Sequence, residues 1–131
     1  MNPEGKAEIL IVDSDPEIQK YLSENVDSCV FEGVSTIDEG RERVSNRMDR
    51  PYDGVIVDTA APGGLRFAEE LRETVENVQV IVHTTDDNGL HEEYLRKLGV
   101  TKYLVKPYDS DTNLPRVVEE VAEQIREHPN G

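Results

Sequence analysis

The sequence predicts an α/β protein in which helices cover both faces of a five-stranded parallel sheet. Two observations support this class. Apolar runs typical of strands alternate five times with segments of helical periodicity, and under the right-handed crossover rule such an alternation gives a parallel sheet. The clearest runs are short, rich in β-branched residues and nearly free of polar residues, as in strands buried on both faces. They are residues 9–12, 55–57, 80–83 and 103–105.

The first strand, residues 9–12, is followed by a helix whose start is marked by two residues. Asp15 is a typical N-cap residue, and Pro16 suits the first helical position because that position needs no N–H donor. Apolar residues then recur at helical spacing, which predicts one buried face. They are Ile18, Tyr21, Leu22 and Val26.

The second strand, residues 30–34, precedes a helix that begins with a capping box. Thr36 and Glu39 have the spacing at which a hydroxyl group and a carboxylate cap a helix reciprocally. Pro51 is expected to end this helix, because proline disrupts a helix interior. The apolar face of the helix is thin and consists of Ile37, Val44 and Met48.

The second half of the chain gives three strands and three helices. The third strand ends at Asp58, and residues 60–64 form a turn rich in glycine and proline. The fourth strand covers residues 78–84, and the helix after it is expected to end at Gly99. The fifth strand covers residues 102–105. The apolar faces are expected to be Leu65, Ala68, Leu71 and Val75 in the third helix, Leu90, Tyr94, Leu95 and Leu98 in the fourth, and Leu114, Val117, Val118, Val121, Ala122 and Ile125 in the fifth.

Length and composition narrow the possible functions. A chain of 131 residues is expected to form a single domain over residues 1–131, with a core of about residues 7–127 and short polar ends. The formal net charge of −14 argues against binding to nucleic acid or to an anionic membrane, and it suits a high-salt cytoplasm. The polar start resembles no signal peptide and no stretch could span a bilayer, so we expect a cytoplasmic protein. Cys29, the single cysteine, is expected in the core.

Four polar residues stand where four apolar runs stop: Asp13, Asp58, Thr84 and Lys106. Parallel strands share one carboxyl edge, and ligands of open α/β sheets bind there. Two carboxylates can hold a magnesium ion, and a lysine beside them suits an anionic ligand. Each residue alone is more often a cap or a member of an ion pair. Together they predict a phosphoryl-transfer site.

Four segments of the chain together follow the pattern of one known family. They are residues 9–16, residues 52–58 with Pro62, residues 80–84 and residues 99–108. The most specific matches are Lys106-Pro107 followed by Tyr108, and the lone Asp58 at a strand end. Over nearly its whole length the chain thus resembles the receiver domain of two-component response regulators. The resemblance implies a flavodoxin-like (βα)5 doubly wound fold with strand order 2-1-3-4-5.

The resemblance also implies a role for each residue at the predicted edge. Asp58 would accept a phosphoryl group from a sensor histidine kinase or a phosphotransfer protein, and Thr84 and Lys106 would contact that group. Asp13, Asp58 and the backbone carbonyl of Ala60 would hold Mg²⁺. The domain would catalyse at most its own phosphorylation and dephosphorylation.

The output of such a domain is a change in a protein-interaction surface. The resemblance implies that Thr84 and Tyr103 form the switch and that the peptide bond before Pro107 is cis. The face made by the fourth helix, the fifth strand and the fifth helix would bind a downstream protein or a second copy of the chain.

Three features depart from the pattern of the family. Ser14 stands where receivers usually place a second acid that binds magnesium directly, so a neutral hydroxyl group replaces a charged ligand. The loop after Asp58 is shorter than usual. Ala60 and Asp86 occupy positions that tune the lifetime of the phosphoryl group in receivers. We expect weak magnesium binding and altered kinetics.

Two other functions remain open. The missing acid at Ser14 would suit a receiver-like module that binds partners without phosphorylation. The start of the chain also resembles the nucleophile motif of haloacid-dehalogenase-type phosphatases. That function would use Asp13 as nucleophile, Asp15 as general acid, Thr84 and Lys106 in later motifs, and Asp109 or Asp111 as metal ligands.

We expect none of the three histidines to take part in the chemistry of the site. His83 lies among apolar residues of the fourth strand and is expected to be packed and hydrogen-bonded. His91 and His128 are expected to be solvated. A simple core position is the alternative for Tyr103, whose role as a switch comes from the resemblance alone.

Overall fold

The computed structural model describes residues 5–107 and 113–127, which contain one five-stranded sheet. The strand order is β2-β1-β3-β4-β5, and every neighbouring pair is parallel. This order confirms the expected flavodoxin-like (βα)5 fold. The elements are β1 (Ala7–Val12), α1 (Pro16–Asn25), β2 (Cys29–Val34), α2 (Ile37–Ser45), β3 (Gly54–Val57), α3 (Gly64–Thr74), β4 (Gln79–Thr84), α4 (Gly89–Leu98), β5 (Lys102–Val105) and α5 (Asn113–Glu127).

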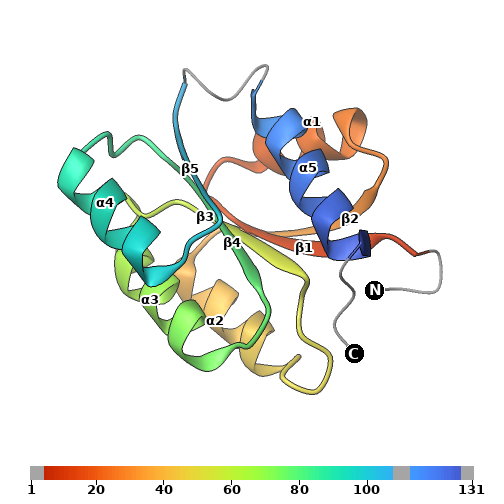
Figure 1. Cartoon of the computed structure of the whole chain (residues 1–131), viewed down its shortest axis with the longest axis horizontal. Coiled ribbons are helices and arrows are strands. Elements are labelled where there is room, and N and C mark those ends of the chain that lie inside the picture. The colour runs from red at the N-terminus through yellow and green to blue at the C-terminus, as the bar shows by residue number, and fades with distance from the viewer. Residues whose placement is uncertain (1–4, 108–112, 128–131) are drawn as a thin grey trace.

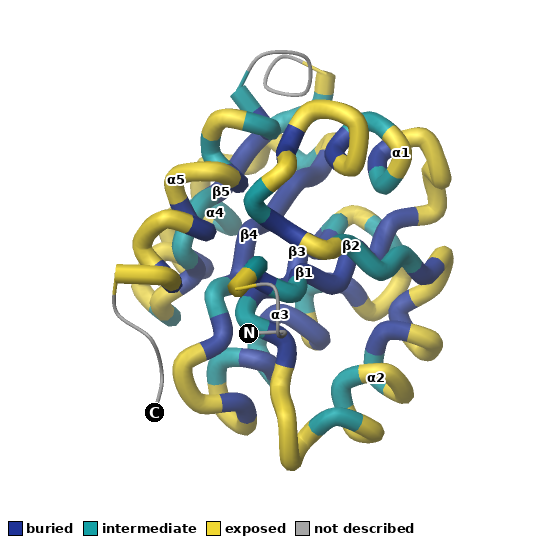
Figure 2. Tube along the Cα trace, turned by 90° about the vertical axis from the view of Figure 1, so that its right-hand side faces the viewer, coloured by how far each residue is buried: buried dark blue, intermediate teal, exposed yellow. Residues whose placement is uncertain are grey.

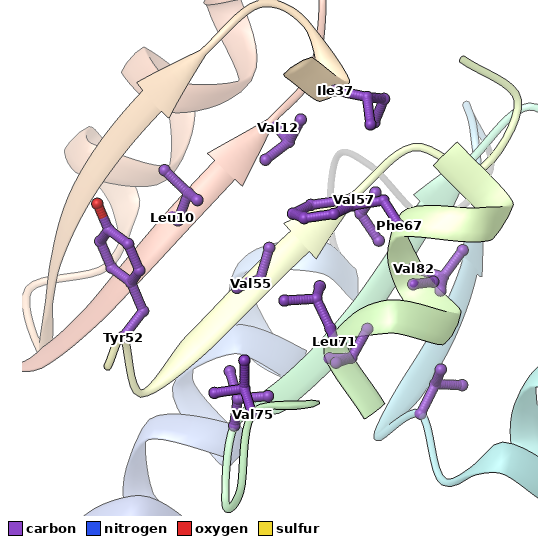
Figure 3. Packing of buried hydrophobic residues seen from close by; sticks show 14 of the residues in the cluster. Leu10, Val12, Ile37, Tyr52, Val55, Val57, Phe67, Leu71, Val75 and Val82 are labelled. Atoms are coloured by element: carbon purple, nitrogen blue, oxygen red, sulfur yellow. The ribbon is translucent and has the colours of Figure 1, made fainter. Parts of the chain in front are cut away.

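Helices cover both faces of the sheet, with α1 and α5 on one side and α2, α3 and α4 on the other (Figure 1). On the side of α3, Phe67 and Leu71 pack against Val55, Val57 and Val82 of the strands (Figure 3). Burial of a side chain as large as Phe67 contributes about 1.5–3 kcal/mol to the stability of the fold.

A second hydrophobic cluster fills the opposite side of the sheet. Ile9 and Ile11 of β1 and Leu114 and Val118 of α5 belong to it, and all four are buried. Because both faces of the central strands are covered, these strands lie inside the molecule (Figure 2) and have no polar side to expose. This arrangement explains why the strand sequences are almost continuously apolar.

The register of the strands aligns their carboxyl ends. Val12 of β1 pairs with Val57 of β3, and Val57 pairs with Val82 of β4. Thr84, the last residue of β4, pairs with Val105 of β5. The residues that follow β1, β3 and β5 therefore reach the same edge of the sheet as the end of β4.

The predicted starts of the first two helices are confirmed. The side chain of Asp15 accepts the backbone N–H of Glu17 at 3.0 Å, and Pro16 is the first residue of α1. The Thr36 hydroxyl oxygen accepts the backbone N–H of Glu39 at 3.2 Å and donates to the Glu39 carboxylate at 3.0 Å. Both caps satisfy backbone N–H groups that have no partner within the helix.

The end of α2 differs from the prediction. The helix stops at Ser45 rather than at Pro51, and Met48, assigned to its apolar face, is 49% exposed. The backbone N–H of Arg47 bonds to the carbonyl of Val44, a spacing of three residues instead of four. Tight turns of this kind end an α-helix before any proline is reached.

The buried strip of α4 is also narrower than predicted. Gly99 ends the helix with a φ of 100°, as expected, and Leu95 is fully buried. Leu90 and Tyr94, however, are 75% and 42% exposed, so their assignment to the inward face is wrong. The helix packs against α3 and the edge strand β5, which leaves only a narrow strip of it against the core.

Two of the predictions made from composition concern the burial of Cys29 and the presence of membrane-spanning segments. Cys29 is buried at the start of β2, as expected for a small core residue. In the part of the chain that the structure describes, no helix is both long and apolar enough to cross a membrane.

Candidate functional site

Two carboxylates stand at the carboxyl edge of the sheet, one after β1 and one after β3. Asp13 is 6% exposed, and its Oδ1 accepts the backbone N–H of Asp15 at 2.9 Å. Oδ1 of Asp58 accepts the backbone N–H of Ala60 at 2.9 Å. Each carboxylate is therefore held through Oδ1 by the loop that follows its strand.

Lys106, which follows β5, joins the two carboxylates. Its Nζ lies 2.7 Å from Oδ2 of Asp13 and 3.1 Å from Oδ2 of Asp58. Burial of the ammonium group lowers the pKa of Lys106, but its hydrogen bonds and its attraction to both carboxylates outweigh burial and leave the pKa raised. The lysine is therefore charged at neutral pH and neutralises part of the negative charge at the edge.

Thr84, at the end of β4, faces the carboxylate of Asp58. The Thr84 hydroxyl oxygen accepts the backbone N–H of Ala60 and that of Asp86, each at 3.1 Å. Burial of the Asp58 carboxylate raises its pKa, but hydrogen bonds from Thr84 and Ala60 and the charge of Lys106 outweigh burial, so the pKa is lowered. Asp58 is therefore ionised at neutral pH.

Tyr103 of β5 is buried and pairs with Val82 of β4, two residues before Thr84. Its hydroxyl group donates to the backbone carbonyl of Asp86 at 2.5 Å. Burial of the phenol, together with the nearby negative charge of Asp86, raises the pKa of Tyr103 to about 12.

The backbone around Lys106 is also fixed at the end of β5. The backbone N–H of Lys106 bonds to the carbonyl of Thr84 at 2.7 Å, and the Lys106–Pro107 peptide bond is cis.

A groove of about 550 Å³ lies beside Asp58 and is lined by Ser14, Asp58 and Ala60, among other residues. In the described segments, no three histidine, cysteine or acidic side chains form a group that could hold a metal ion. Magnesium, however, often uses only one or two carboxylates and completes its shell with water and phosphate oxygens. The carboxylates of Asp13 and Asp58, which both contact Lys106, are enough in number for an ion of this kind.

Gly64 supports the site in a way that sequence reasoning missed. It is the first residue of α3, and a Cβ atom there would lie 2.3 Å from the carbonyl oxygen of Asp58 and 2.9 Å from Cα of Thr59. Only glycine therefore lets α3 start this close to the loop that carries Asp58. In the sequence, the signal for this close approach was the pair of adjacent glycines in the turn. Gly63, the first of the pair, has a φ of 81°.

His91 makes a contact that was not predicted for it. Its side chain is 45% exposed, yet its Nδ1 lies 2.6 Å from Oδ2 of Asp86. A contact between a loop residue and a residue on the next helix leaves no signature in sequence spacing. His83, by contrast, is completely buried, which agrees with the packed position expected for it.

Several residues named in the sequence analysis lie outside the described segments: Tyr108, Asp109, Asp111 and His128. The two aspartates were candidate metal ligands of the phosphatase hypothesis. Asp15, the candidate general acid of that hypothesis, is the N-cap of α1 and is exposed.

Comparison with known proteins gives one family. The model of the response regulator receiver domain family matches residues 9–118. Among curated proteins, hybrid signal transduction histidine kinase D of Dictyostelium discoideum is 28% identical over 122 residues, which are 89% of this chain and 8% of that protein. The transcriptional regulatory protein PcoR of Escherichia coli is 29% identical over 113 residues, covering 83% of this chain and 49% of PcoR. The chain thus spans less than half of either protein.

Protein PilH of Pseudomonas aeruginosa is of similar size to this chain. It is 28% identical over 115 residues, covering 85% of this chain and 94% of PilH. Among solved structures, a CheY-like response regulator receiver domain protein from Methanospirillum hungatei has a TM-score of 0.75 at 21% identity and covers 93% of this chain and 98% of its own. A receiver domain protein from Clostridium thermocellum has a TM-score of 0.76 at 23% identity, with coverages of 92% and 98%. These structures share the fold.

Proposed function

This chain belongs to the response regulator receiver domain family, and from that premise we propose that Asp58 accepts a phosphoryl group from a sensor histidine kinase or a phosphotransfer protein. The observation that carries the proposal is the contact of Lys106 Nζ with the carboxylates of both Asp13 and Asp58. This arrangement offers an ionised nucleophile with a fixed cation beside it.

The transfer turns a phosphohistidine and an aspartate into a histidine and an aspartyl phosphate. An oxygen of Asp58 forms a bond to phosphorus while the bond from phosphorus to the imidazole nitrogen of the donor breaks. The imidazole keeps the electron pair of that bond and takes up a proton. The Lys106 ammonium group and the Thr84 hydroxyl group donate to the phosphoryl oxygens, where negative charge gathers in the transition state.

We assign Mg²⁺ to the groove beside Asp58, with Asp13, Asp58 and the Ala60 carbonyl as ligands from the protein. When bound, the ion would neutralise charge on the phosphoryl oxygens. Ser14 offers a neutral hydroxyl group at the position where a third acid would raise the affinity. We therefore expect magnesium to bind weakly unless a phosphoryl group adds its own oxygen ligands.

Phosphorylation would act on the face formed by α4, β5 and α5. Thr84 accepts hydrogen bonds near Asp58, and Tyr103 lies one strand away with its hydroxyl group on Asp86. A phosphoryl group that drew the Thr84 side chain toward itself would change the hydrogen bonds of Asp86 and, through them, those of Tyr103. That face would then bind a downstream protein or a second copy of the chain.

One observation favours a second function, an interaction module that works without phosphorylation. Ser14 lines the groove beside Asp58 and adds no charge to it. A module of this kind would present the same face of α4, β5 and α5 constantly.

The test is phosphorylation by a small donor. We would incubate the chain with acetyl phosphate and Mg²⁺ and measure its intact mass, in parallel with Asp58→Asn and with the control Asp38→Asn, whose exposed carboxylate lines the same groove. One added phosphoryl group in the unchanged chain and in the control, but not in Asp58→Asn, supports the proposal. No added mass in any of them, at raised Mg²⁺ and salt, contradicts it and favours the constitutive module.

A further inference from the structure

Asp86 lies in the loop between β4 and α4 and uses all four of its polar groups. Its backbone N–H donates to the Thr84 hydroxyl oxygen at 3.1 Å, and its carbonyl accepts the Tyr103 hydroxyl group at 2.5 Å. Oδ1 of its carboxylate accepts the backbone N–H of Asn88 at 3.0 Å, and Oδ2 lies 2.6 Å from Nδ1 of His91. One residue thus connects a half-exposed histidine on α4 with two residues of the proposed site.

We propose that His91 is a positioning residue whose protonation state sets the arrangement of Thr84 and Tyr103 through Asp86. The effect on phosphorylation rests on the function proposed for Asp58. The coupling between His91 and the loop does not, because it concerns the unphosphorylated chain.

The direction of the effect follows from the contact between His91 and Asp86. An imidazolium group donates a charge-assisted hydrogen bond to a carboxylate, and such a bond is stronger than one from a neutral ring. The hydrogen bond from His91 also lowers the pKa of the Asp86 carboxyl group. Protonated His91 therefore holds Asp86 in the arrangement described here, and this restraint weakens as the pH rises and the ring loses its charge.

Tyr103, which bonds to the carbonyl of Asp86, is the other titratable group joined to this pair. The charged side chains that act on it are Asp86 and Asp87 of the loop and Glu92 of α4. Burial raises the pKa of Tyr103 to about 12, so the phenol stays neutral. Histidine is the side chain whose ordinary pKa places its charge change between about pH 5 and pH 8. The His91 side chain is 45% exposed, so solvent reaches the ring.

The restraint reaches the candidate phosphoacceptor through Thr84. The Thr84 hydroxyl oxygen accepts both the N–H of Asp86 and the N–H of Ala60, and Ala60 also donates to Asp58. A shift of the loop around Asp86 therefore changes the hydrogen bonds beside the Asp58 carboxylate. We expect the site to be better organised for phosphorylation when His91 is protonated.

The direct test is a pH titration of the unphosphorylated chain by NMR between about pH 5 and pH 8, the range of histidine. The backbone amide signals of Ala60, Thr84 and Asp86 should shift with the midpoint shown by the His91 ring. In His91→Gln, which cannot change its charge, these shifts should be lost. In His91→Lys, which stays positive, the signals should remain near their low-pH positions. Lys97→Gln, an exposed change on the same helix, should titrate like the unchanged chain.

A second measurement links the coupling to the proposed function. At about pH 8 an ordinary histidine is neutral. At this pH we expect acetyl phosphate to phosphorylate His91→Lys about fivefold faster than His91→Gln, because about fivefold is the low end of the coupling found between sites in proteins. Amide signals that ignore the His91 midpoint, or that titrate equally in His91→Gln, would overturn the inference. If the amides follow His91 but Asp58 takes no phosphoryl group in the unchanged chain, the coupling stands and the proposed function fails.

Discussion

Lys106 is the residue on which the candidate site depends most. The side chains of Asp13 and Asp58 are only 2% and 14% exposed, and Lys106 lies within 3.1 Å of both. Two carboxylates that share a partly buried position disfavour each other's charge. The lysine helps Asp58 to remain ionised, which this residue needs if it is to act as a nucleophile.

Replacing Lys106 with methionine keeps the aliphatic stem and removes the charge. We expect the free energy of unfolding at neutral pH to fall by about 2 kcal/mol, because a buried carboxylate loses its charged partner. Lys106 helps to lower the pKa of Asp58, so its contribution is present above the ordinary aspartate pKa of about 4 and is lost as the pH falls below the lowered value. Urea unfolding of the unchanged chain and of Lys106→Met, at neutral pH and again at a pH below the lowered pKa of Asp58, measures the loss of stability.

The matched control for this change is Lys97→Met, because Lys97 is 74% exposed and pairs with Glu93 one turn away on the helix. Its loss should stay within about 0.5 kcal/mol. An equal effect of the two substitutions at neutral pH would show that the pairing of Lys106 contributes nothing.

Ser14 decides how much negative charge the groove offers to a cation. We expect Ser14→Asp to lower the Kd for Mg²⁺ by about tenfold, because affinity for hard cations rises with the number of charged oxygen ligands. Isothermal titration calorimetry would measure it. Ser35→Asp is the control, since Ser35 lines the same groove and adds the same charge away from the ligands. Equal affinities of the two variants would mean that general electrostatic attraction, and not ligation, governs binding.

At the scale of elements, the junction between β3 and α3 couples stability to the site. The backbone N–H of Gly64 bonds to the carbonyl of Ala61 at 2.8 Å, and that of Ala61 bonds to the carbonyl of Asp58 at 3.2 Å. Helix α3 thus begins directly against the loop that carries the candidate phosphoacceptor. Its buried Phe67 and Leu71 anchor this start to the core.

Gly64→Ala tests this close approach. A Cβ atom 2.3 Å from the carbonyl oxygen of Asp58 cannot be accommodated without moving the backbone, so we expect the free energy of unfolding to fall by about 1–3 kcal/mol. Gly89→Ala is the control, because Gly89 starts α4 and has no atom within 4 Å of an added Cβ. Unfolding in urea compares them, and a Gly64→Ala variant as stable as Gly89→Ala would contradict the argument.

At the scale of the whole molecule, net charge is the dominant property. With 28 acidic residues against 14 lysines and arginines, the folded chain repels itself, and salt should relieve this repulsion. We expect Tm to rise as NaCl increases from about 0.1 M to about 1 M, where the Debye length falls from about 10 Å to about 3 Å. Differential scanning calorimetry would follow the change.

The control removes charge instead of screening it. A variant with Glu119→Gln, Glu120→Gln and Glu123→Gln changes three exposed residues of α5. It should have a higher Tm than the unchanged chain at low salt and a smaller increase with salt. If the two chains respond equally to salt, self-repulsion is not the cause of the increase.

The sequence by itself determined the class of the fold, the caps and the residues at the functional edge. Strand positions follow from short apolar runs, and the caps of Asp15 and Thr36 involve residues two or three positions apart. The meeting of Asp13 and Asp58 at one edge follows from the parallel arrangement of strands. All of these depend on local periodicity or on a general rule of topology, so no distance between remote segments has to be known.

Only the tertiary structure decided how these parts touch. The lysine at residue 106 reaches a carboxylate 93 positions earlier, Gly64 meets the carbonyl of Asp58, and His91 bonds to Asp86. The early end of α2 and the exposure of Leu90 were likewise set by where each helix lies on the sheet. Contacts of this kind depend, to within a few ångströms, on how a loop folds back on the next helix or on where a helix lies on the sheet, and neither follows from residue spacing or periodicity.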